Sequence, residues 1–407
     1  MKQIRGDDHL LSLECLETPA HKLSAPEEWD ALVRQTGAEI YFLSDWQKVW
    51  WHHYGADFSS GREAACFILR KGGQVVGALP FCLETIWAGP VPVRVARLAG
   101  VDANFAVMTL PIAAGMETEA LTAVFSFLVH DLRCTTISLS PLSQQSQQLE
   151  PVRAACSGCD AITEVRYRSD RGHTLMHLPD NPDAFMTALS KSRRREVRRD
   201  LKRLTRDEPL RNTCSTADTQ DDMMDRFIDL HTRQWEAAGK GGHFSDWRVA
   251  AAFYRALLHQ LAPNGQAAID EQWLGDTLLS SQLRFMLGAK TYWWLNARSV
   301  DPRFSKVGLG RVGLVERAED LINAGTRLVE AGAGKYEYKL SYGGELVPLH
   351  SLVLASTRPV ARLQAQALLL WADTLHLLYY RLWFLKIRPR LNTRPRPLWT
   401  AWIRTRL

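Results

Sequence analysis

Residues 303–313 read RFSKVGLGRVG, with glycines at positions 308, 310 and 313. The next segment, LVERAEDLINAG at 314–325, has the apolar spacing of a helix. Glycines directly before a helix leave backbone N–H groups open to an anion, and the helix dipole favours negative charge at that end. The stretch therefore predicts a loop that holds a phosphate group at the start of a helix.

The spacing of this loop also matches the dinucleotide-binding fingerprint, because Glu330 lies about 20 residues beyond the glycines, where a ribose-binding acid is expected. In that fold, however, the glycines follow an apolar strand at once. Here the strand-like segment YWWLNA at 292–297 is separated from Gly308 by RSVDPRFSKV, which contains Pro302 and four charged residues. An insertion of this length does not fit a tight strand–turn–helix, so the pattern favours another kind of phosphate site.

The composition is that of an ordinary globular protein. The chain has 407 residues, which is enough for two domains, with 46% hydrophobic and 23% charged residues. Its seven cysteines are dispersed, and the single C-x-x-C pair, Cys156 and Cys159, has no second pair to complete a zinc site. The first 20 residues lack the apolar core of a secretory signal. We therefore expect a cytoplasmic protein that uses no metal.

The order of predicted elements repeats along the chain. In the first half, a helix and an aromatic segment precede a hairpin at 64–84, a helix pattern at 116–132 and a strand at 135–142. In the second half, helix patterns precede strands at 266–274, 277–288 and 290–300, then the glycine loop with its helix, then a strand at 326–332.

This repeat predicts an α/β (α+β) fold with two tandem modules, each a mixed, mainly antiparallel sheet flanked by helices. We expect the modules at 1–165 and 166–355, followed by a helical tail at 356–407.

The tail is apolar and basic. Residues 363–391 are strongly apolar, although Asp373, His376 and Arg381 interrupt them, and the uncharged runs are too short to span a bilayer. Arginines flank this segment, and Asp373 is the only acid from Arg358 onward. A helix lying in an anionic membrane surface has these features. A helix docked on the protein's own apolar surface has them too, so both alternatives stay open.

Several segments together resemble one family. They are FLSDWQKVWWHHYG (42–55), GGQVVGALPF (72–81), LSKSRRREVRRDLKRL (189–204), FIDLHTRQWEAAG (227–239), SVDPRFSKVGLGRVGLVERAEDLINAG (299–325) and VEAGAGKYEYKLSYG (329–343). In order and spacing they resemble the BioF2-like branch of the GNAT acyltransferase superfamily, which includes CelD-type cellulose-biosynthesis proteins and is similar to FemAB-type aminoacyltransferases. The resemblance implies transfer of an acyl group from a thioester to an amine or a hydroxyl, without a metal.

The resemblance also assigns a ligand to the glycine loop. In GNAT proteins an R/Q-x-x-G-x-G/A segment opens a helix and holds the diphosphate of acetyl-CoA or another acyl-CoA on its backbone amides. This chain has SKVGLG, with Ser305 at the first position. The implied cofactor-binding residues lie in the second module and are Lys306, Val307, Gly308, Leu309, Gly310 and Arg311.

Direct acyl transfer also needs a base and a group that stabilises the leaving thiolate. Glu330 and Glu337 are the candidate bases, and Tyr338 and Lys339 are candidates to contact the thiolate or an anionic substrate. Each carboxylate has an alternative role in a surface ion pair. Where the family has a segment similar to DFGRGDExYK, this chain has EAGAGKYEYK, with Glu330 in place of an Asp and Lys335 where an acid is common.

Further candidates lie on a helix and a strand. His231 and Trp235 are four residues apart and so share a helix face, where a histidine can act as a proton acceptor or as a buried structural group. Trp294 is a candidate to line an acceptor groove with Trp235. The basic run from Lys191 to Arg206 forms either a solvated helix or an anion-binding face, and it lacks the interleaved aromatic residues that favour nucleic acid.

These features together predict an acyl-CoA-dependent acyltransferase whose acceptor is a small molecule or a cell-envelope or exopolysaccharide precursor. The expected location is the cytoplasm, with peripheral contact to an anionic membrane through the tail and no nucleic-acid partner. Two alternatives remain. One is an aminoacyl transferase that uses aminoacyl-tRNA, and the other is a non-catalytic relative that binds a partner in polysaccharide synthesis.

Overall fold

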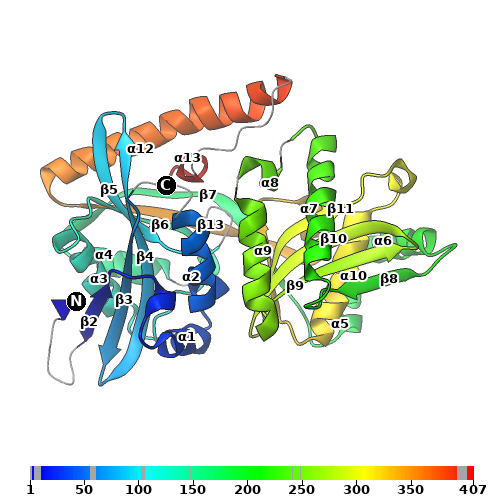
Figure 1. Cartoon of the computed structure of the whole chain (residues 1–407), viewed down its shortest axis with the longest axis horizontal. Coiled ribbons are helices and arrows are strands. Elements are labelled where there is room, and N and C mark those ends of the chain that lie inside the picture. Colours follow the sequence, from blue (N-terminus) through cyan, green and yellow to red (C-terminus); the bar gives the residue numbers. More distant parts are fainter. Residues whose placement is uncertain are drawn as a thin grey trace. The chain divides into compact units, whose positions relative to one another are not determined.

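The computed structural model describes residues 2–3, 11–55, 61–101, 106–146, 148–240, 242–247, 249–391 and 401–407. The chain forms two compact units (Figure 1). Unit 1 contains Met1–Arg171 and Pro348–Leu391 together with the C-terminal residues, and unit 2 contains Gly172–Val347. Within the described ranges, no helix combines the length and the apolar character needed to cross a membrane.

Unit 1 is built on one mainly antiparallel sheet. Its strands lie in the order β1-β2-β3-β4-β5-β6-β13-β7, in which β5 and β6 pair in parallel and the pairs β1–β2, β2–β3, β3–β4, β4–β5 and β6–β13 are antiparallel. The hairpin of β3 and β4 turns at Gly72 and Gly73, which both have positive φ values that glycine adopts without strain. The strands are β1 (Lys2–Gln3), β2 (Ser12–Leu16), β3 (Glu63–Lys71), β4 (Gln74–Ala88), β5 (Val91–Leu98), β6 (Thr136–Ser143), β7 (Ile162–His177) and β13 (Gly344–Ser356).

Helices flank this sheet, and polar contacts fix their ends. Asp30 accepts hydrogen bonds from the backbone N–H and the hydroxyl of Ser44, each at 2.8 Å, and so joins two helices at the point where the second begins. The Trp29 indole donates to the Phe42 carbonyl at 2.7 Å. The helices are α1 (Pro26–Gln35), α2 (Ser44–Trp50), α3 (Glu117–His130), α4 (Leu149–Ser157), α12 (Pro359–Leu375) and α13 (Ala401–Thr405).

Unit 2 repeats this plan with strands in the order β7-β12-β11-β10-β9-β8, and among its described strand pairs only β11 with β12 is parallel. Its strands are β8 (Leu210–Cys214), β9 (Ala267–Leu274), β10 (Thr277–Leu287), β11 (Lys290–Arg298) and β12 (Leu328–Ala333), with the ends of β7 and β13. Its helices are α5 (Pro182–Ala188), α6 (Lys191–Leu204), α7 (Gln220–Ala237), α8 (His243–Asp246), α9 (Ala250–Leu261), α10 (Leu309–Asn323) and α11 (Glu337–Ser341).

Helices cover both faces of the unit 2 sheet. Trp293 and Val329 pack with Val197 of α6 and Leu314 of α10 in one apolar core. The helices α7 and α9 cover the opposite face. Neighbouring residues of β9 point to opposite sides of the sheet, so their side chains pair with residues of different helices. Asp270 faces Arg317 of α10 at 3.5 Å.

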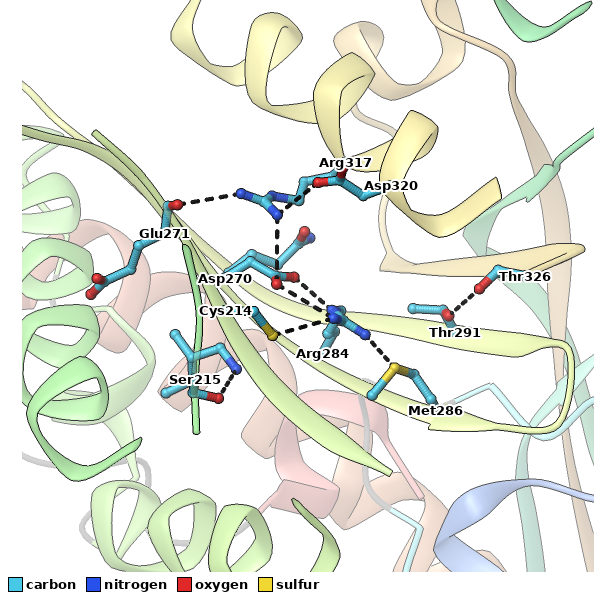
Figure 2. A network of polar contacts seen from close by, with 12 residues as sticks. Cys214, Ser215, Asp270, Glu271, Arg284, Met286, Thr291, Arg317, Asp320 and Thr326 are labelled. Atoms are coloured by element: carbon cyan, nitrogen blue, oxygen red, sulfur yellow. Dashed lines mark hydrogen bonds and ion pairs between the residues drawn. The ribbon is translucent and has the colours of Figure 1, made fainter. Parts of the chain in front are cut away.

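A buried polar network lies between β9, β10 and α10 (Figure 2). The Asp270 carboxylate is 3% exposed and accepts from Arg284 Nε at 2.6 Å. Figure 2 also shows Arg284 beside the sulfur atoms of Cys214 and Met286. Arg317 reaches the Asp320 carboxylate at 2.9 Å on the outer side of the network. The two arginines therefore balance the charges of the two carboxylates, Asp270 inside the network and Asp320 at its outer side.

These observations confirm the predicted α/β fold with two tandem modules of mixed, mainly antiparallel sheet. Two local details differ from the expected helices and strands. The helix pattern at 182–206 forms two helices, because Ser190 accepts from the Arg193 N–H at 3.3 Å and starts α6 as its N-cap. The 16-residue strand β7 was not predicted, because its many charged residues mask any apolar alternation.

Candidate functional site

The parallel strands of unit 2 separate after a short pairing. The β11–β12 register holds three residue pairs and ends where Tyr292 lies opposite Glu330. Beyond that point β11 continues beside β10 as far as Arg298, whereas β12 continues beside β7, where Ala333 lies opposite His173. Strands that part in this way leave backbone groups of the sheet without their partner strand, which creates a place for an extended ligand.

A buried pair lies where the strands part. His173 Nδ1 is 3.0 Å from Glu330 Oε1, and the two side chains are 0% and 4% exposed. The N–H of Gly332 also donates to Oε1, at 3.2 Å. Gly332 has a φ of +86°, a conformation that favours glycine, and this bulge in β12 turns its N–H back toward the carboxylate.

The hydrogen bonds of this pair involve one of the two carboxylate oxygens of Glu330. Among the described residues, both hydrogen bonds of the Glu330 side chain go to Oε1, and Oε2 makes none. With Glu330 ionised, the proton between the two side chains belongs to His173 Nδ1, which then donates to the carboxylate. A carboxylate oriented in this way by two donors has the arrangement that a general base needs.

Lys339 completes the cluster. Its side chain is buried, and its ammonium group donates to the Ala331 carbonyl. Burial lowers the pKa of Lys339 to about 8, although attraction to Glu330 opposes this shift. The Tyr336 and Tyr338 rings lie near the ammonium group, with centroids 5.0 and 6.0 Å from Nζ. The predicted residues Glu330, Tyr338 and Lys339 therefore lie together.

The lowered pKa of Lys339 predicts a pH-dependent stability. The unfolded side chain keeps its proton up to about pH 10.5, whereas the folded one loses it near pH 8. The free-energy cost of burying a charged ammonium group therefore disappears from the folded state as the pH rises through this window. We expect the free energy of unfolding to rise between these pH values by roughly 1–3 kcal/mol relative to Lys339→Met. Urea unfolding at several pH values measures this difference, and parallel pH curves for the two proteins would contradict it.

The predicted phosphate loop lies at the start of α10, and an acid of the protein itself already contacts it. Asp200 of α6 is fully buried, and its Oδ2 accepts from the Gly308 N–H at 3.0 Å and from Arg311 Nε at 2.6 Å. Burial acts to raise the pKa of Asp200, but these two donors outweigh it and keep the pKa below its usual value. An anionic carboxylate therefore sits where the loop was expected to receive a phosphate.

The other residues of the loop differ in their surroundings. A Cβ atom at position 308 would overlap the Arg311 guanidinium, whereas a Cβ at position 310 would meet no atom within 4 Å. Leu309 is buried in a small apolar cluster, with Val307 packed against it. Lys306 is exposed, and its backbone carbonyl accepts from Arg203 at 3.2 Å. Space beside the loop is thus found at Gly310, and Gly308 is close-packed.

The remaining predicted residues lie elsewhere in unit 2. Glu337 is exposed at the start of α11, and Trp294 belongs to β11. His231 and Trp235 do contact each other, because the indole N–H donates to His231 Nε2 at 2.9 Å. Burial lowers the pKa of His231 to about 4, so this histidine is neutral, with its Nε2 engaged by Trp235. The pair lies on α7, which packs on β9, β10 and β11.

Two residues of this site were not predicted from the sequence. His173 lies on the unpredicted strand β7, and Asp200 lies within the basic run of α6. The only local signal was that Asp200 and Glu196 are the two acids among eight basic residues of α6. In the described part of the chain, no group of three His, Cys, Asp or Glu side chains is arranged to hold a metal ion.

Comparison with known proteins gives one family match and several similar folds. Residues 191–340 match the family described as "Acetyltransferase (GNAT) domain", and none of the curated proteins matches the chain. Among solved structures, FemX aligns with a TM-score of 0.61 and 13% identity, covering 86% of this chain and 99% of FemX.

Two further structures are similar over most of the chain. A conserved protein of unknown function from Bacteroides thetaiotaomicron aligns with a TM-score of 0.50 and 11% identity, covering 85% of this chain and all of that protein. A tandem GNAT protein from the clavulanic acid biosynthesis pathway aligns with a TM-score of 0.44 and 17% identity, covering 85% and 99%. At such low identity the alignments with FemX and the Bacteroides thetaiotaomicron protein show similarity of fold alone.

Proposed function

We propose, from the premise that this chain is an acyltransferase with a GNAT domain at residues 191–340, that it moves an acyl group from acyl-CoA directly to an amine or hydroxyl of its acceptor. The observation that carries this proposal is the buried Glu330–His173 pair at the point where β11 and β12 separate. As its resemblance to BioF2-like and CelD-type proteins suggests, we infer that the acceptor is a small molecule or a precursor of the cell envelope or an exopolysaccharide.

The proposed reaction uses the groups around this pair. Glu330 Oε2 takes the proton of the acceptor N–H or O–H as its nitrogen or oxygen attacks the thioester carbonyl. The new C–N or C–O bond forms, the C–S bond breaks, and the departing thiolate takes a proton from the Lys339 ammonium group. Backbone N–H groups of β11 beyond Tyr292, where β12 no longer runs beside it, are suited to stabilise the oxyanion.

In unit 1, a segment of the chain itself fills the position that corresponds to the proposed ligand site of unit 2. This difference supports the proposal that acyl-CoA binds to unit 2 and not to unit 1. There β5 and β6 also pair over three residues, but the chain itself fills the position beyond them. Val107 donates to the Pro141 carbonyl and accepts from the Ser143 N–H, each at 2.8 Å. The Glu39 carboxylate holds the next two residues by their N–H groups. A backbone segment therefore lies where a ligand would lie in unit 2.

Binding of acyl-CoA is tested at Gly310, the open position of the loop. Gly310→Glu places a carboxylate beside the proposed diphosphate, and we expect it to weaken acetyl-CoA binding by about tenfold or more through like-charge repulsion. The matched variant Gly310→Gln has the same size without the charge, and we expect a change below about threefold. Both side chains suit the first turn of a helix, so folding is preserved. Isothermal titration measures the dissociation constants.

The Asp200 contact gives this experiment a second arm. If a diphosphate binds the loop, it competes with the Asp200 carboxylate for the Gly308 N–H and for Arg311. Asp200→Asn removes the competing charge and should tighten acetyl-CoA binding. Equal affinities for the wild type, Gly310→Glu and Asp200→Asn would remove the loop from the proposed site.

The reaction itself is tested by release of free thiol. The purified protein is incubated with acetyl-CoA or longer acyl-CoAs and a panel of amines and hydroxyl compounds, and we expect thiol release that depends on the acceptor. Transfer that occurs only with aminoacyl-tRNA would replace acyl-CoA by the aminoacyl donor. Absence of transfer from either donor, together with absence of acyl-CoA binding, would overturn the proposal and favour a non-catalytic binding protein.

A further inference from the structure

The tail helix of unit 1 is fixed on the sheet by one face. Leu368, Leu369 and Ala372 of α12 pack against Ile86 and Val93 in one apolar cluster. The helix crosses the hairpin of β4 and β5, as Figure 1 shows for the orange element labelled α12. It continues without a break as a wider helical segment over His376–Ile387. The buried face therefore has its partner within unit 1.

The opposite face of this helix is apolar and exposed. Leu363, Leu370 and Leu377 follow one another at intervals of seven residues, which places them on one side of a helix, and they are 66%, 70% and 58% exposed. The same exposed series continues into the following segment with Leu378, Leu382, Trp383 and Leu385. Single exposed leucines are ordinary on protein surfaces, whereas a series along a whole helix marks an interaction site.

Polar contacts set the orientation of this helix. Arg166 of β7 binds the Asp373 carboxylate with two hydrogen bonds, at 3.1 and 2.7 Å. The Gln364 amide donates to the Pro92 carbonyl at 3.0 Å, and Arg358 donates to the Val129 carbonyl at 3.2 Å. These contacts hold the apolar series away from the sheet. They also neutralise Asp373, the only acid from Arg358 to the C-terminus.

The surroundings of the exposed series are strongly positive. From Arg358 onward the chain has ten Lys and Arg residues. Arg381, Lys386 and Arg390 are exposed in the segment that carries the second half of the apolar series. A row of leucines with a tryptophan and flanking basic side chains matches the boundary of an anionic bilayer, where apolar groups enter the acyl region and cations meet the head groups.

We infer that this exposed face of α12 and its continuation lies in the surface of an anionic phospholipid membrane and holds the protein there. A second copy of the chain is the less suitable occupant. A symmetric pair of these helices brings the same basic residues face to face, which is unfavourable without acids to pair with them. The inference stands on the tail alone and is independent of the proposed acyl transfer.

The test uses the full chain and lipid vesicles. We expect the wild type to sediment with vesicles of phosphatidylglycerol and phosphatidylcholine, and to bind vesicles of phosphatidylcholine alone at least tenfold more weakly. The variant Leu363→Ser, Leu370→Ser, Leu377→Ser should lose binding to both. Because these leucines are exposed, circular dichroism and the melting temperature should stay close to those of the wild type.

A charge reversal supplies the matched control. Arg381→Glu, Lys386→Glu, Arg390→Glu should weaken binding to the anionic vesicles on the order of a hundredfold at low salt. The same three reversals on α6, at Arg195, Arg198 and Lys202, remove equal charge from exposed positions of unit 2 and should change binding little. Equal loss in both variants would reduce the effect to net charge and overturn the inference.

Light scattering distinguishes a membrane from a second copy. We expect the wild type to show the same mass as the triple serine variant in solution. A wild-type dimer that becomes a monomer in the serine variant, with no sedimentation on either kind of vesicle, would show that the face is a contact between copies. That result would also overturn the inference, whereas acyl transfer to a free acceptor would be unaffected.

Discussion

Glu330→Gln is expected to lower the rate of acyl transfer by about two to four orders of magnitude while acetyl-CoA binding stays within about threefold of the wild type. The amide keeps the shape of the side chain and can still accept from the Gly332 N–H, but it cannot take a proton from the acceptor. His173→Gln should give a smaller loss, because the histidine orients the carboxylate from 3.0 Å and does not itself contact the reacting atoms. Thiol release under saturating acetyl-CoA measures both effects.

Two other acids make this prediction specific. Glu345 is exposed on β13, and Glu345→Gln should leave the rate unchanged. Glu337 was the second base predicted from the sequence, and it is exposed at the start of α11. A loss for Glu337→Gln as large as the loss for Glu330→Gln would show that the buried pair is not the sole base. A loss for Glu337→Gln alone would transfer the role to that residue.

Asp270→Asn is expected to destabilise the protein by about 3–5 kcal/mol, because it leaves the buried Arg284 without its ion-pair partner (Figure 2). The Arg284 side chain is 15% exposed, so water cannot replace the carboxylate effectively. The double variant Asp270→Leu with Arg284→Met removes both charges and should recover most of the lost stability. Urea unfolding of unit 2, followed by tryptophan fluorescence, measures the free energies.

Asp320 provides the matched control for this network. It binds Arg317 at 2.9 Å, but its side chain is 53% exposed, so Asp320→Asn should cost less than about 1 kcal/mol. Equal costs for Asp270→Asn and Asp320→Asn would mean that burial does not govern the strength of these ion pairs. A double variant no more stable than Asp270→Asn would point to packing, and not to the unpaired charge, as the source of the loss.

Much of the fold follows from patterns that span fewer than about 20 residues. The hairpin at Gly72 and Gly73, the strands β9 to β11 and the helix after the glycine loop are each set by apolar period and turn residues. The order of these elements was enough to predict two related modules. The strand β7 escaped prediction because its charged residues find distant partners, such as Asp373, which lies 207 residues from Arg166.

The residues of the candidate site also divide into those that a local sequence pattern predicts and those that only the folded chain brings together. Glu330, Tyr338 and Lys339 lie within ten residues of one another, and their segment could be recognised from the sequence. His173 is 157 residues from Glu330, and Asp200 is 108 residues from Gly308. No local pattern contains such a pairing, because it depends on which strands and helices become neighbours in the folded sheet. The sequence predicted a loop whose backbone N–H groups are free to bind a phosphate. In the structure the N–H of Gly308, the first glycine of the loop, already donates to Asp200.

The sequence by itself indicated the two-module α/β architecture, a resemblance to GNAT acyltransferases, the candidate base Glu330 and an apolar, basic tail helix. Only the tertiary structure decided that Glu330 pairs with His173 through Oε1, that Asp200 engages the glycine loop, and which side of the tail helix stays exposed. The physical reason is that residue type and spacing set local conformation, whereas burial and pairing depend on strand register and helix packing between residues far apart in the chain.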